Sequence, residues 1–120
     1  MPFAIIDGDD VGNKIESRIL ANDVTGFVRT SKMIADTVDR LIDYTSTIPG
    51  VTVVSSGGDS ILLQVAENSI LSLSEALEEL QEPDVFTFSA GIGQTLRESF
   101  IALRVAKSSG KRRVSIFAEN

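Results

Sequence analysis

The chain has 120 residues, of which 42% are hydrophobic and 23% are charged, and its net charge is −6. It contains no cysteine and no histidine. The absence of cysteine excludes disulfides, zinc–thiolate sites and a cysteine nucleophile. The absence of histidine excludes a Ser-His-Asp triad and imidazole metal sites. Any catalysis must therefore use carboxylates, lysines, arginines, hydroxyls, backbone amides or a hard metal ion.

The positive charges are concentrated in one segment. Five of the eleven Lys and Arg residues lie between Arg104 and Arg113, while the other six are opposed by seventeen Asp and Glu. This distribution does not fit a protein that binds nucleic acid along a whole face. It suits binding of a compact anion such as a phosphate group, although cations near a helix C-terminus also stabilise the helix itself.

Nothing in the sequence indicates export or membrane insertion. The N-terminus lacks a basic start, and its apolar run stops at Asp7, so it does not resemble a signal peptide. No apolar stretch approaches the roughly 20 residues that cross a bilayer. We expect a soluble, cytoplasmic protein with no membrane partner.

Apolar periodicity and turn residues predict nine helices and strands in one domain, residues 1–120. A strand over residues 3–6 leads into a carboxylate-rich loop, and Ser69 is a candidate helix cap. In chain order, the elements are a strand at 3–6, a helical region from 11 to about 48 with a break at 22–26, strands at 51–55 and 61–65, a helix at 70–81, a strand at 85–90, a helix at 96–108 ended by Gly110, and a strand at 114–117.

This element order predicts an α+β fold. The core βαββαβ pattern is ferredoxin-like, with a mainly antiparallel sheet that carries its helices on one face. In such a sheet the first strand lies beside the central hairpin, so the end of the first strand and the hairpin tip meet at the same edge. Asp7 and Asp59 are therefore expected side by side, with Asp9 or Asp10 close to them.

Two adjacent carboxylates repel each other, and a divalent cation relieves the repulsion. Mg²⁺ (or Mn²⁺) prefers carboxylate, carbonyl and water oxygens, often with substrate phosphates. Backbone amides between Gly8 and Asn13, at a helix start, can bind phosphate, and the cationic segment can supply counter-charge. Each feature alone is more typical of an ordinary turn or a solvated surface. Together they predict a metal-dependent nucleotidyl-transfer site.

Four segments resemble a known superfamily. Residues 5–12 (IIDGDDVG), 56–59 (SGGD) and 89–93 (SAGIG) resemble the signature of palm-domain cyclases and polymerases. Residues 102–114 (ALRVAKSSGKRRV) are similar to the end of GGDEF diguanylate cyclases. Within the superfamily, the DGDDVG opening and the small size resemble the minimal CRISPR polymerases (mCpol), relatives of the polymerase subunit of type III CRISPR complexes.

The resemblance implies a ferredoxin-like palm/nucleotide-cyclase sandwich that acts as a homodimer, with its active site at the interface. It implies a nucleotidyltransferase that makes a cyclic dinucleotide from ATP for anti-phage signalling, without a nucleic-acid template. By position, Asp7 and Asp59 ligate metal with help from the Gly8 carbonyl. The phosphate and nucleotide contacts implied are Asp10, Gly12, Asn13, Gly57, Gly58, Lys107 and Lys111.

The chain departs from the family pattern at Ser60, because the residue after Gly-Gly-Asp is usually acidic. Three explanations are open: Asp9 or Asp10 supplies the missing carboxylate, the metal alone activates the substrate hydroxyl, or turnover is slow. Two other functions are also open. One is a catalytically inactive palm domain that binds or senses nucleotides, and the other is a mononucleotide cyclase.

Overall fold

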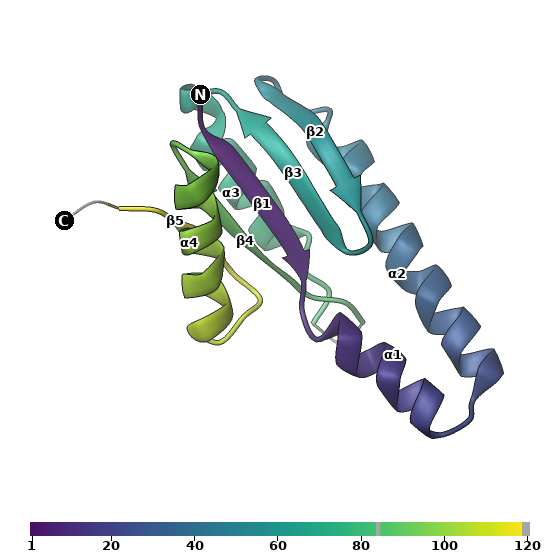
Figure 1. Cartoon of the computed structure of the whole chain (residues 1–120). Helices are drawn as coiled ribbons and strands as arrows, with labels where there is room; N and C mark the ends of the chain where they lie inside the picture. The colour runs from purple at the N-terminus through teal and green to yellow at the C-terminus, as the bar shows by residue number, and fades with distance from the viewer. Residues whose placement is uncertain (84, 119–120) are drawn as a thin grey trace.

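The centre of the protein is a five-stranded sheet with strand order β2-β3-β1-β4-β5 (Figure 1). The computed structural model describes residues 1–83 and 85–118. Neighbouring strands pair antiparallel, except that β4 and β5 pair in parallel. The predicted α+β class with a mainly antiparallel sheet is confirmed. The strands are β1 (Phe3–Gly8), β2 (Val51–Gly57), β3 (Ser60–Val65), β4 (Phe88–Gly93) and β5 (Val114–Ile116).

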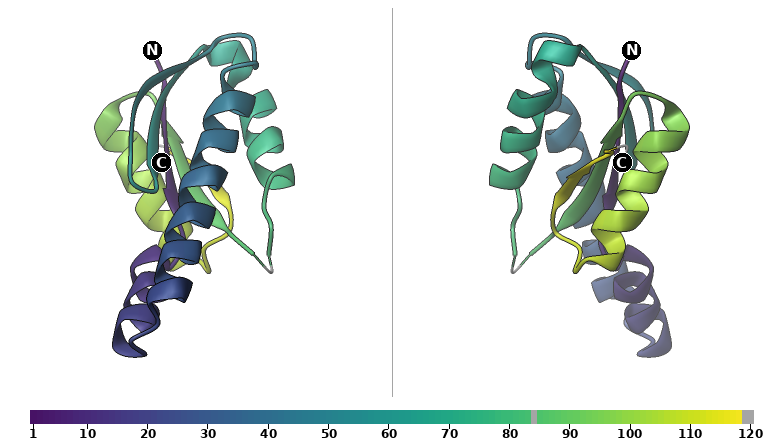
Figure 2. Two further views of the ribbon diagram at one scale, coloured as in Figure 1. Left: turned by 90° about the vertical axis from the view of Figure 1, so that its right-hand side faces the viewer. Right: turned by 90° about the vertical axis from the view of Figure 1, so that its left-hand side faces the viewer.

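Helices cover both faces of the sheet. Helices α2 and α3 lie on one face and α4 lies on the other (Figure 2). The expectation that all helices share one face is therefore wrong for α4. None of the helices among the described residues is both long and apolar enough to cross a membrane. The helices are α1 (Val11–Leu20), α2 (Val24–Thr45), α3 (Ile70–Glu79), which follows the 3₁₀ turn η1 (Glu67–Ser69), and α4 (Leu96–Ser108).

The alternation of side chains along β4 explains the position of α4. Phe88, Ala90 and Ile92 point into the core on the α3 side of the sheet. Gly91 points to the other side, where a Cβ atom would lie 2.1 Å from the backbone nitrogen of Leu103 in α4. The missing side chain lets the α4 backbone pack directly on the strand. Sequence alone indicates that a backbone approaches here, but not which one.

The hydrophobic core lies between the sheet and helices α2 and α3. Alternate residues of β1, β3 and β4 point into it, as period-2 patterning requires. The helices contribute residues spaced three or four apart, which form a single apolar stripe on each helix. The buried apolar residues of this core include Ala4, Ile6, Ile61, Leu63, Val65, Phe88, Ala90 and Ile92 from the sheet and Ile34, Val38, Leu41, Leu73 and Leu77 from the helices.

Several element boundaries differ from those predicted. Strand β1 continues to Gly8, so Asp7 is a strand residue paired with Ser60 on β3 and Ser89 on β4. Strand β4 begins at Phe88 rather than at residue 85. Ser69 does not cap α3 with its side chain; its hydroxyl donates instead to the carbonyl of Pro49. The predicted helix break is present, but it lies at residues 21–23 rather than 22–26. Asp23 caps α2 by accepting a hydrogen bond from the Gly26 amide.

Helix α2 is longer than the sheet face that it covers. Its 22 residues span about 33 Å, and its apolar core residues begin only at Ile34. The first part of α2 packs against α1 instead, and this helical hairpin projects beyond the sheet (Figure 1). The molecule is consequently elongated, with principal dimensions of 47 × 30 × 22 Å.

Candidate active site

Two carboxylates lie side by side where β1 meets the tip of the β2–β3 hairpin. Asp7 is paired in register with Ser60, the residue that follows Asp59. The amide of Gly8 donates to the carbonyl of Asp59 over 3.1 Å, which ties the hairpin tip to the end of β1. The structure thus brings together Asp7 and Asp59, the two residues that the sequence assigns to a metal.

The two carboxylates of this pair repel each other. Burial raises the pKa of Asp59 above its ordinary value, and the negative charge of Asp7 raises it further. A divalent cation between the two carboxylates would remove this penalty. The Ser60 hydroxyl donates a hydrogen bond to Asp7 Oδ1 over 2.5 Å. That bond fixes the orientation of the Asp7 carboxylate.

Lys107 reaches the same place from the last turn of α4. Its ammonium donates to the carbonyl of Gly8 and to Asp9 Oδ1, each over 2.8 Å, and it lies 3.3 Å from Asp7 Oδ2. The sequence assigns Lys107 to a triphosphate, but here its ammonium is held by protein oxygens. The Gly8 carbonyl, which the resemblance assigns to the metal, here accepts a hydrogen bond from the Lys107 ammonium.

Asp9 is enclosed in a hydrogen-bond network beneath the two carboxylates. Its side chain is 2% exposed and accepts from Ser89, Thr87, Lys107 and the Arg112 amide. Burial acts to raise the pKa of Asp9, but these hydrogen bonds outweigh it and hold the pKa below its usual value. Asp9 is therefore built into the framework that holds the site. The catalytic role predicted for Asp9 stays a prediction.

Asp10 and Lys111 form an ion pair at the edge of this network. The hydrogen bond that Lys111 donates to the Asp10 carboxylate raises the pKa of Lys111. Lys111 and Arg112 both adopt positive φ, at 62° and 49°, and this tight turn aims the Arg112 amide at Asp9. The left-handed region is uncommon for residues other than glycine, so the turn is held by its partners.

The remaining predicted residues lie at the rim of the site. Gly12 is an exposed residue in the first turn of α1, and Asn13 follows it on the exposed side. Gly57 and Gly58 form the exposed hairpin tip, where Gly58 adopts a φ of 59° and a Cβ at either position would meet no atom within 4 Å. These positions leave open space beside the carboxylates.

A hollow of about 260 Å³ opens next to Asp59, between α1, α2 and the hairpin tip. Its walls are mainly apolar, and Ser31 is the hydroxyl-bearing residue among them. This hollow was not predicted from the sequence, although the spacing of Val11 and Ile15 by four residues marks one face of α1. The residues that line it are Val11, Ile15, Ser31, Ile34, Ala35, Gly58 and Asp59.

The donor set suits Mg²⁺ carried in with a substrate. The described residues contain no group of three or more acidic side chains that could cage an ion. Mg²⁺ is commonly held by one or two carboxylates together with substrate phosphates and water. Asp7 and Asp59 provide that minimum, and burial together with the charge of Asp7 raises the pKa of Asp59, against the opposing effect of Lys107.

Comparison with protein-family models identifies the chain. Residues 3–117 match the model described as mCpol, the minimal CRISPR polymerase domain. The chain belongs to the mCpol family. A search of curated protein sequences finds no match. Membership in the mCpol family agrees with the resemblance carried by the DGDDVG and SGGD segments.

Solved structures of other proteins have a similar fold. A GGDEF domain protein from M. capsulatus superposes on this mCpol chain with a TM-score of 0.69 and 23% identity, covering 98% of this chain and 84% of that one. The GGDEF domain of DgcB from Caulobacter crescentus, in complex with c-di-GMP, gives 0.63 and 15%, covering 96% and 76%. The Csm1–Csm4 cassette in complex with pppApA gives 0.65 and 19%, covering 94% of this chain and 20% of that one.

Family and fold together make this mCpol chain a palm domain of the nucleotide cyclase and polymerase type. Sequence reasoning missed two residues that organise the site. Ser89 on β4 and Thr87, just before this strand, both donate to Asp9, whereas Phe86 and Phe88 point into the core. Polar residues two apart beside Phe86 and Phe88 are the signal that could have identified them.

Proposed function

We propose that this mCpol protein is a Mg²⁺-dependent nucleotidyltransferase that makes a cyclic dinucleotide from ATP as a signal in anti-phage defence. The observation that carries the proposal is the pair Asp7 and Asp59, held side by side at the mouth of an apolar hollow. Family membership supports the reaction class, and the structure of the Csm1–Csm4 cassette with pppApA supports adenine as the base.

In this proposal the hollow beside Asp59 seats the purine. Its apolar walls on α1 and α2 exclude water from the faces of the ring, and the Ser31 hydroxyl is available at the edge. The triphosphate then lies over the exposed glycines of the hairpin tip, where no side chain stands in the way. Asp59 thus lies between the hollow that binds the base and the position of the reacting phosphate.

The reaction joins the hydroxyl oxygen of one nucleotide to the α-phosphorus of another and releases pyrophosphate; a second transfer closes the ring. The bound metal supplies acidification of the attacking hydroxyl and neutralisation of phosphate charge. Asp7 and Asp59 hold that metal, and the Ser60 hydroxyl keeps Asp7 in the ligating orientation. Lys107 fixes the positions of the Asp7 and Asp9 carboxylates through its ion pairs with them. When a nucleotide is bound, its ammonium provides positive charge beside the phosphates.

The test is to incubate the purified protein with ATP and Mg²⁺ and to identify products by mass spectrometry while measuring pyrophosphate. We expect a cyclic dinucleotide from the wild type. Asp59→Asn should lower its formation by at least about 100-fold, because loss of a metal ligand removes several kcal/mol of transition-state stabilisation. The matched control is Asp39→Asn, the same change at an exposed site on α2, which should leave the rate unchanged.

Other products would identify the alternatives. A cyclic mononucleotide would make the protein a mononucleotide cyclase and overturn the proposal. Saturable ATP binding by calorimetry without any pyrophosphate release would make it a nucleotide-binding palm domain, an outcome in keeping with the serine at position 60. Equal product from Asp59→Asn and wild type would show that Asp59 does not hold the metal.

A further inference from the structure

Six Lys and Arg residues lie outside the segment 104–113, and half of them line one hollow. This hollow has a volume of about 340 Å³ and lies between α1 and α2. The residues that line it are spaced three or four apart on each helix, so one face of α1 meets one face of α2 across it. We call it the cationic hollow. Its lining residues are Lys14, Ser17 and Arg18 from α1 and Arg29, Thr30 and Met33 from α2.

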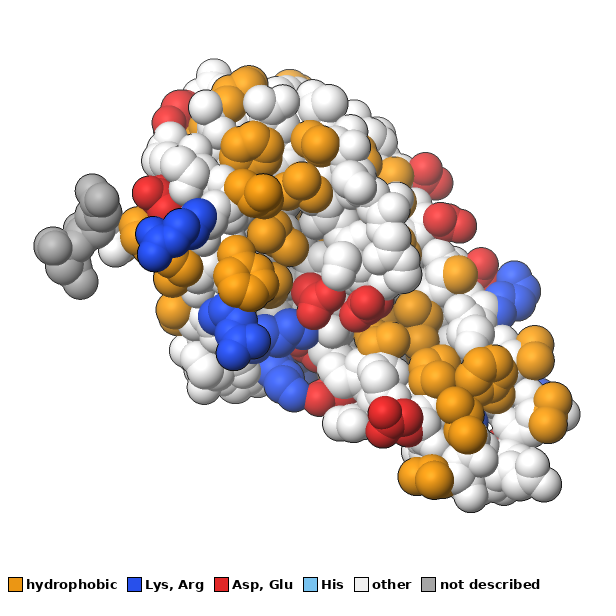
Figure 3. Space-filling view, in the orientation of Figure 1, with side chains coloured by type: hydrophobic (Ala, Val, Ile, Leu, Met, Phe, Trp, Pro, Cys, Tyr) orange, Lys and Arg blue, Asp and Glu red, His pale blue; other side chains and the backbone are white. Residues whose placement is uncertain are grey.

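The cationic hollow is separate from the candidate active site. It shares no lining residue with the hollow beside Asp59, which also lies between α1 and α2 but along different residues of each helix. The cations of the active site, Lys107 and Lys111, come from the end of α4 and the turn after it. Figure 3 shows Lys and Arg side chains beside the acidic side chains at the centre of the molecule, whereas mainly apolar side chains cover the projecting hairpin on that face. The cationic hollow thus adds a second region of positive charge.

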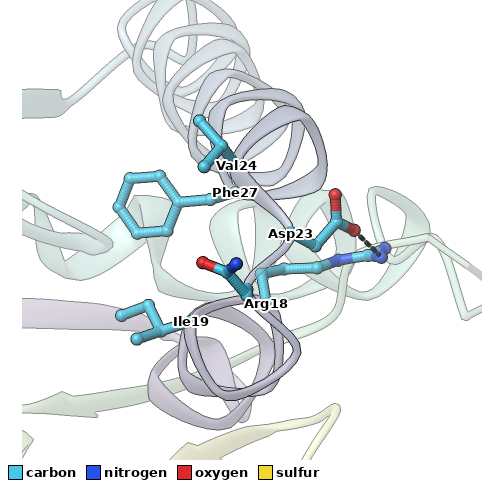
Figure 4. Close-up of a pocket in the computed structure, with 6 residues that line it drawn as sticks. Arg18, Ile19, Asp23, Val24 and Phe27 are labelled. Carbon is cyan, nitrogen blue, oxygen red and sulfur yellow. Dashed lines mark hydrogen bonds and ion pairs between the residues drawn. The ribbon is translucent and has the colours of Figure 1, made fainter.

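Positive charge exceeds negative charge in the cationic hollow. None of its lining residues is acidic. Lys14 and Arg29 form no ion pair with the described residues, and Lys14 donates a 3.4 Å hydrogen bond to the Val85 carbonyl. Arg18 is paired with Asp23 at 3.1 Å, and Figure 4 shows its guanidinium extending away from the labelled apolar side chains of the hairpin. Even with Asp23 counted against Arg18, two positive charges of the hollow lack a carboxylate in the described part of the chain.

A buried hydroxyl in the cationic hollow lacks a protein partner. Thr30 is 9% exposed, and its hydroxyl forms no hydrogen bond with the described residues. The hydroxyls of Thr37 and Thr45, farther along α2, donate instead to carbonyls four residues earlier. No fully buried polar side-chain atom among the described residues lacks a partner, so the Thr30 oxygen is open to the hollow that it lines. A nearly buried hydroxyl without a partner gains free energy when a ligand supplies one.

We propose that the cationic hollow binds a small phosphate-bearing anion, held by the charges of Lys14, Arg18 and Arg29 and by the Thr30 hydroxyl. A guanidinium presents parallel N–H donors that match two oxygens of one phosphate, so a pair of arginines favours phosphate over a spherical anion. The volume of about 340 Å³ is at the lower end of the range for small-molecule sites, which suits a diphosphate group rather than a polymer. This site goes beyond the proposed nucleotidyl transfer and does not depend on it.

A bound anion would also join two helices. Lys14 and Arg18 belong to α1 and Arg29 belongs to α2, so one ligand bridges them. Helix α1 has no buried residue, and with ten residues it is too short to be stable as an isolated helix. Occupation of the cationic hollow should therefore slow amide hydrogen exchange in α1 and raise the melting temperature.

The experiment is calorimetric titration of the protein with inorganic pyrophosphate and with ADP. EDTA is present, so that no metal can bridge a phosphate to the carboxylates of the active site. Arg29→Gln removes one charge of the cationic hollow, and Arg97→Gln is the matched control, the same change at an exposed arginine of α4. Thr30→Val removes the hydroxyl at nearly constant shape. Circular dichroism checks the fold of each variant, and backbone amide chemical shifts locate the bound pyrophosphate.

We expect pyrophosphate to bind the wild type, with a dissociation constant raised about tenfold in Arg29→Gln, about fivefold in Thr30→Val and unchanged in Arg97→Gln. Shift changes should centre on Ser17 and Thr30 and spare Asp59. Tighter binding of ADP than of pyrophosphate identifies a nucleotide as the ligand, and equal binding identifies the diphosphate group as the whole determinant. A wild type that does not bind pyrophosphate, equal weakening in Arg29→Gln and Arg97→Gln, or shift changes confined to residues 107–112 overturns the proposal.

Discussion

Replacing Gly91 by alanine tests the contact that places α4, and with it Lys107, against the active site. The new Cβ would lie 2.1 Å from the Leu103 nitrogen and 2.2 Å from the Ser99 carbonyl oxygen, where 3.4 Å is an ordinary contact. Both atoms belong to the helix backbone and cannot rotate away as a side chain could. Helix α4 must therefore move outward by about 1 Å.

The magnitude follows from that geometry. One extra methyl group in a packed core lowers the free energy of unfolding by about 1–3 kcal/mol where side chains can adjust. A clash with the helix backbone cannot be relieved in this way, so its cost lies at the upper end of that range or above it. We expect Gly91→Ala to lower the free energy of unfolding by about 3 kcal/mol and the melting temperature by roughly 10 °C. Lys107 should also move away from Asp7 and Asp9, because it lies on the displaced helix.

Urea unfolding followed by circular dichroism measures the change, with Gly12→Ala as the control. Gly12 is an exposed helical residue whose added Cβ would meet nothing within 4 Å. The same substitution there should stabilise the protein by up to about 1 kcal/mol, since alanine is the better helix former. If Gly91→Ala unfolds at the urea concentration of the wild type, α4 does not pack on β4 through its backbone.

Two further predictions concern carboxylates of the site. Asp9→Asn should cost about 2–3 kcal/mol at pH 7, since it removes the charge that Lys107 and the Arg112 amide bind. Because the folded-state pKa of Asp9 is lowered, its contribution is complete above the ordinary value of 3.8 and is lost as pH falls through the folded pKa. The difference in free energy of unfolding between wild type and Asp9→Asn, measured by urea unfolding, should therefore shrink as pH falls through the folded-state pKa of Asp9. A difference that does not change with pH would contradict a stabilising charge on Asp9. Ser60→Asp places a third carboxylate beside Asp7 and Asp59, so it should lower the melting temperature without metal and enlarge the rise caused by Mg²⁺. An Mg²⁺ response equal to that of wild type would argue against a metal at this pair.

The pairing of Asp7 with the hairpin tip could be predicted because it depends on strand order and on local turn chemistry. The different fates of Asp7 and Asp9 could not, since two aspartates two residues apart look alike in sequence. What separates them is the end of β1 at Gly8, after which the chain turns and Asp9 enters a space lined by Thr87 and Ser89.

The contacts of Lys107 could not be predicted from the sequence either. Its position in the last turn of a helix indicates a cation near a helix end, which is most often solvated. Its actual partners depend on which face of the sheet α4 covers. That choice depends on Gly91, whose close neighbour is known only from the packed structure.

The network around Asp9 also has a consequence for when the site forms. The side-chain hydroxyl of Thr87 and the amide of Arg112 that bind it lie 78 and 103 residues away along the chain. Closing loops of this length carries a large entropic penalty and comes late in folding, after local helices and the hairpin. The hydrogen bonds around Asp9 are therefore complete only after residues 107–112 have been synthesised and packed against β1. The carboxylates of β1 thus wait for a segment about one hundred residues later in the chain before they are fixed in place.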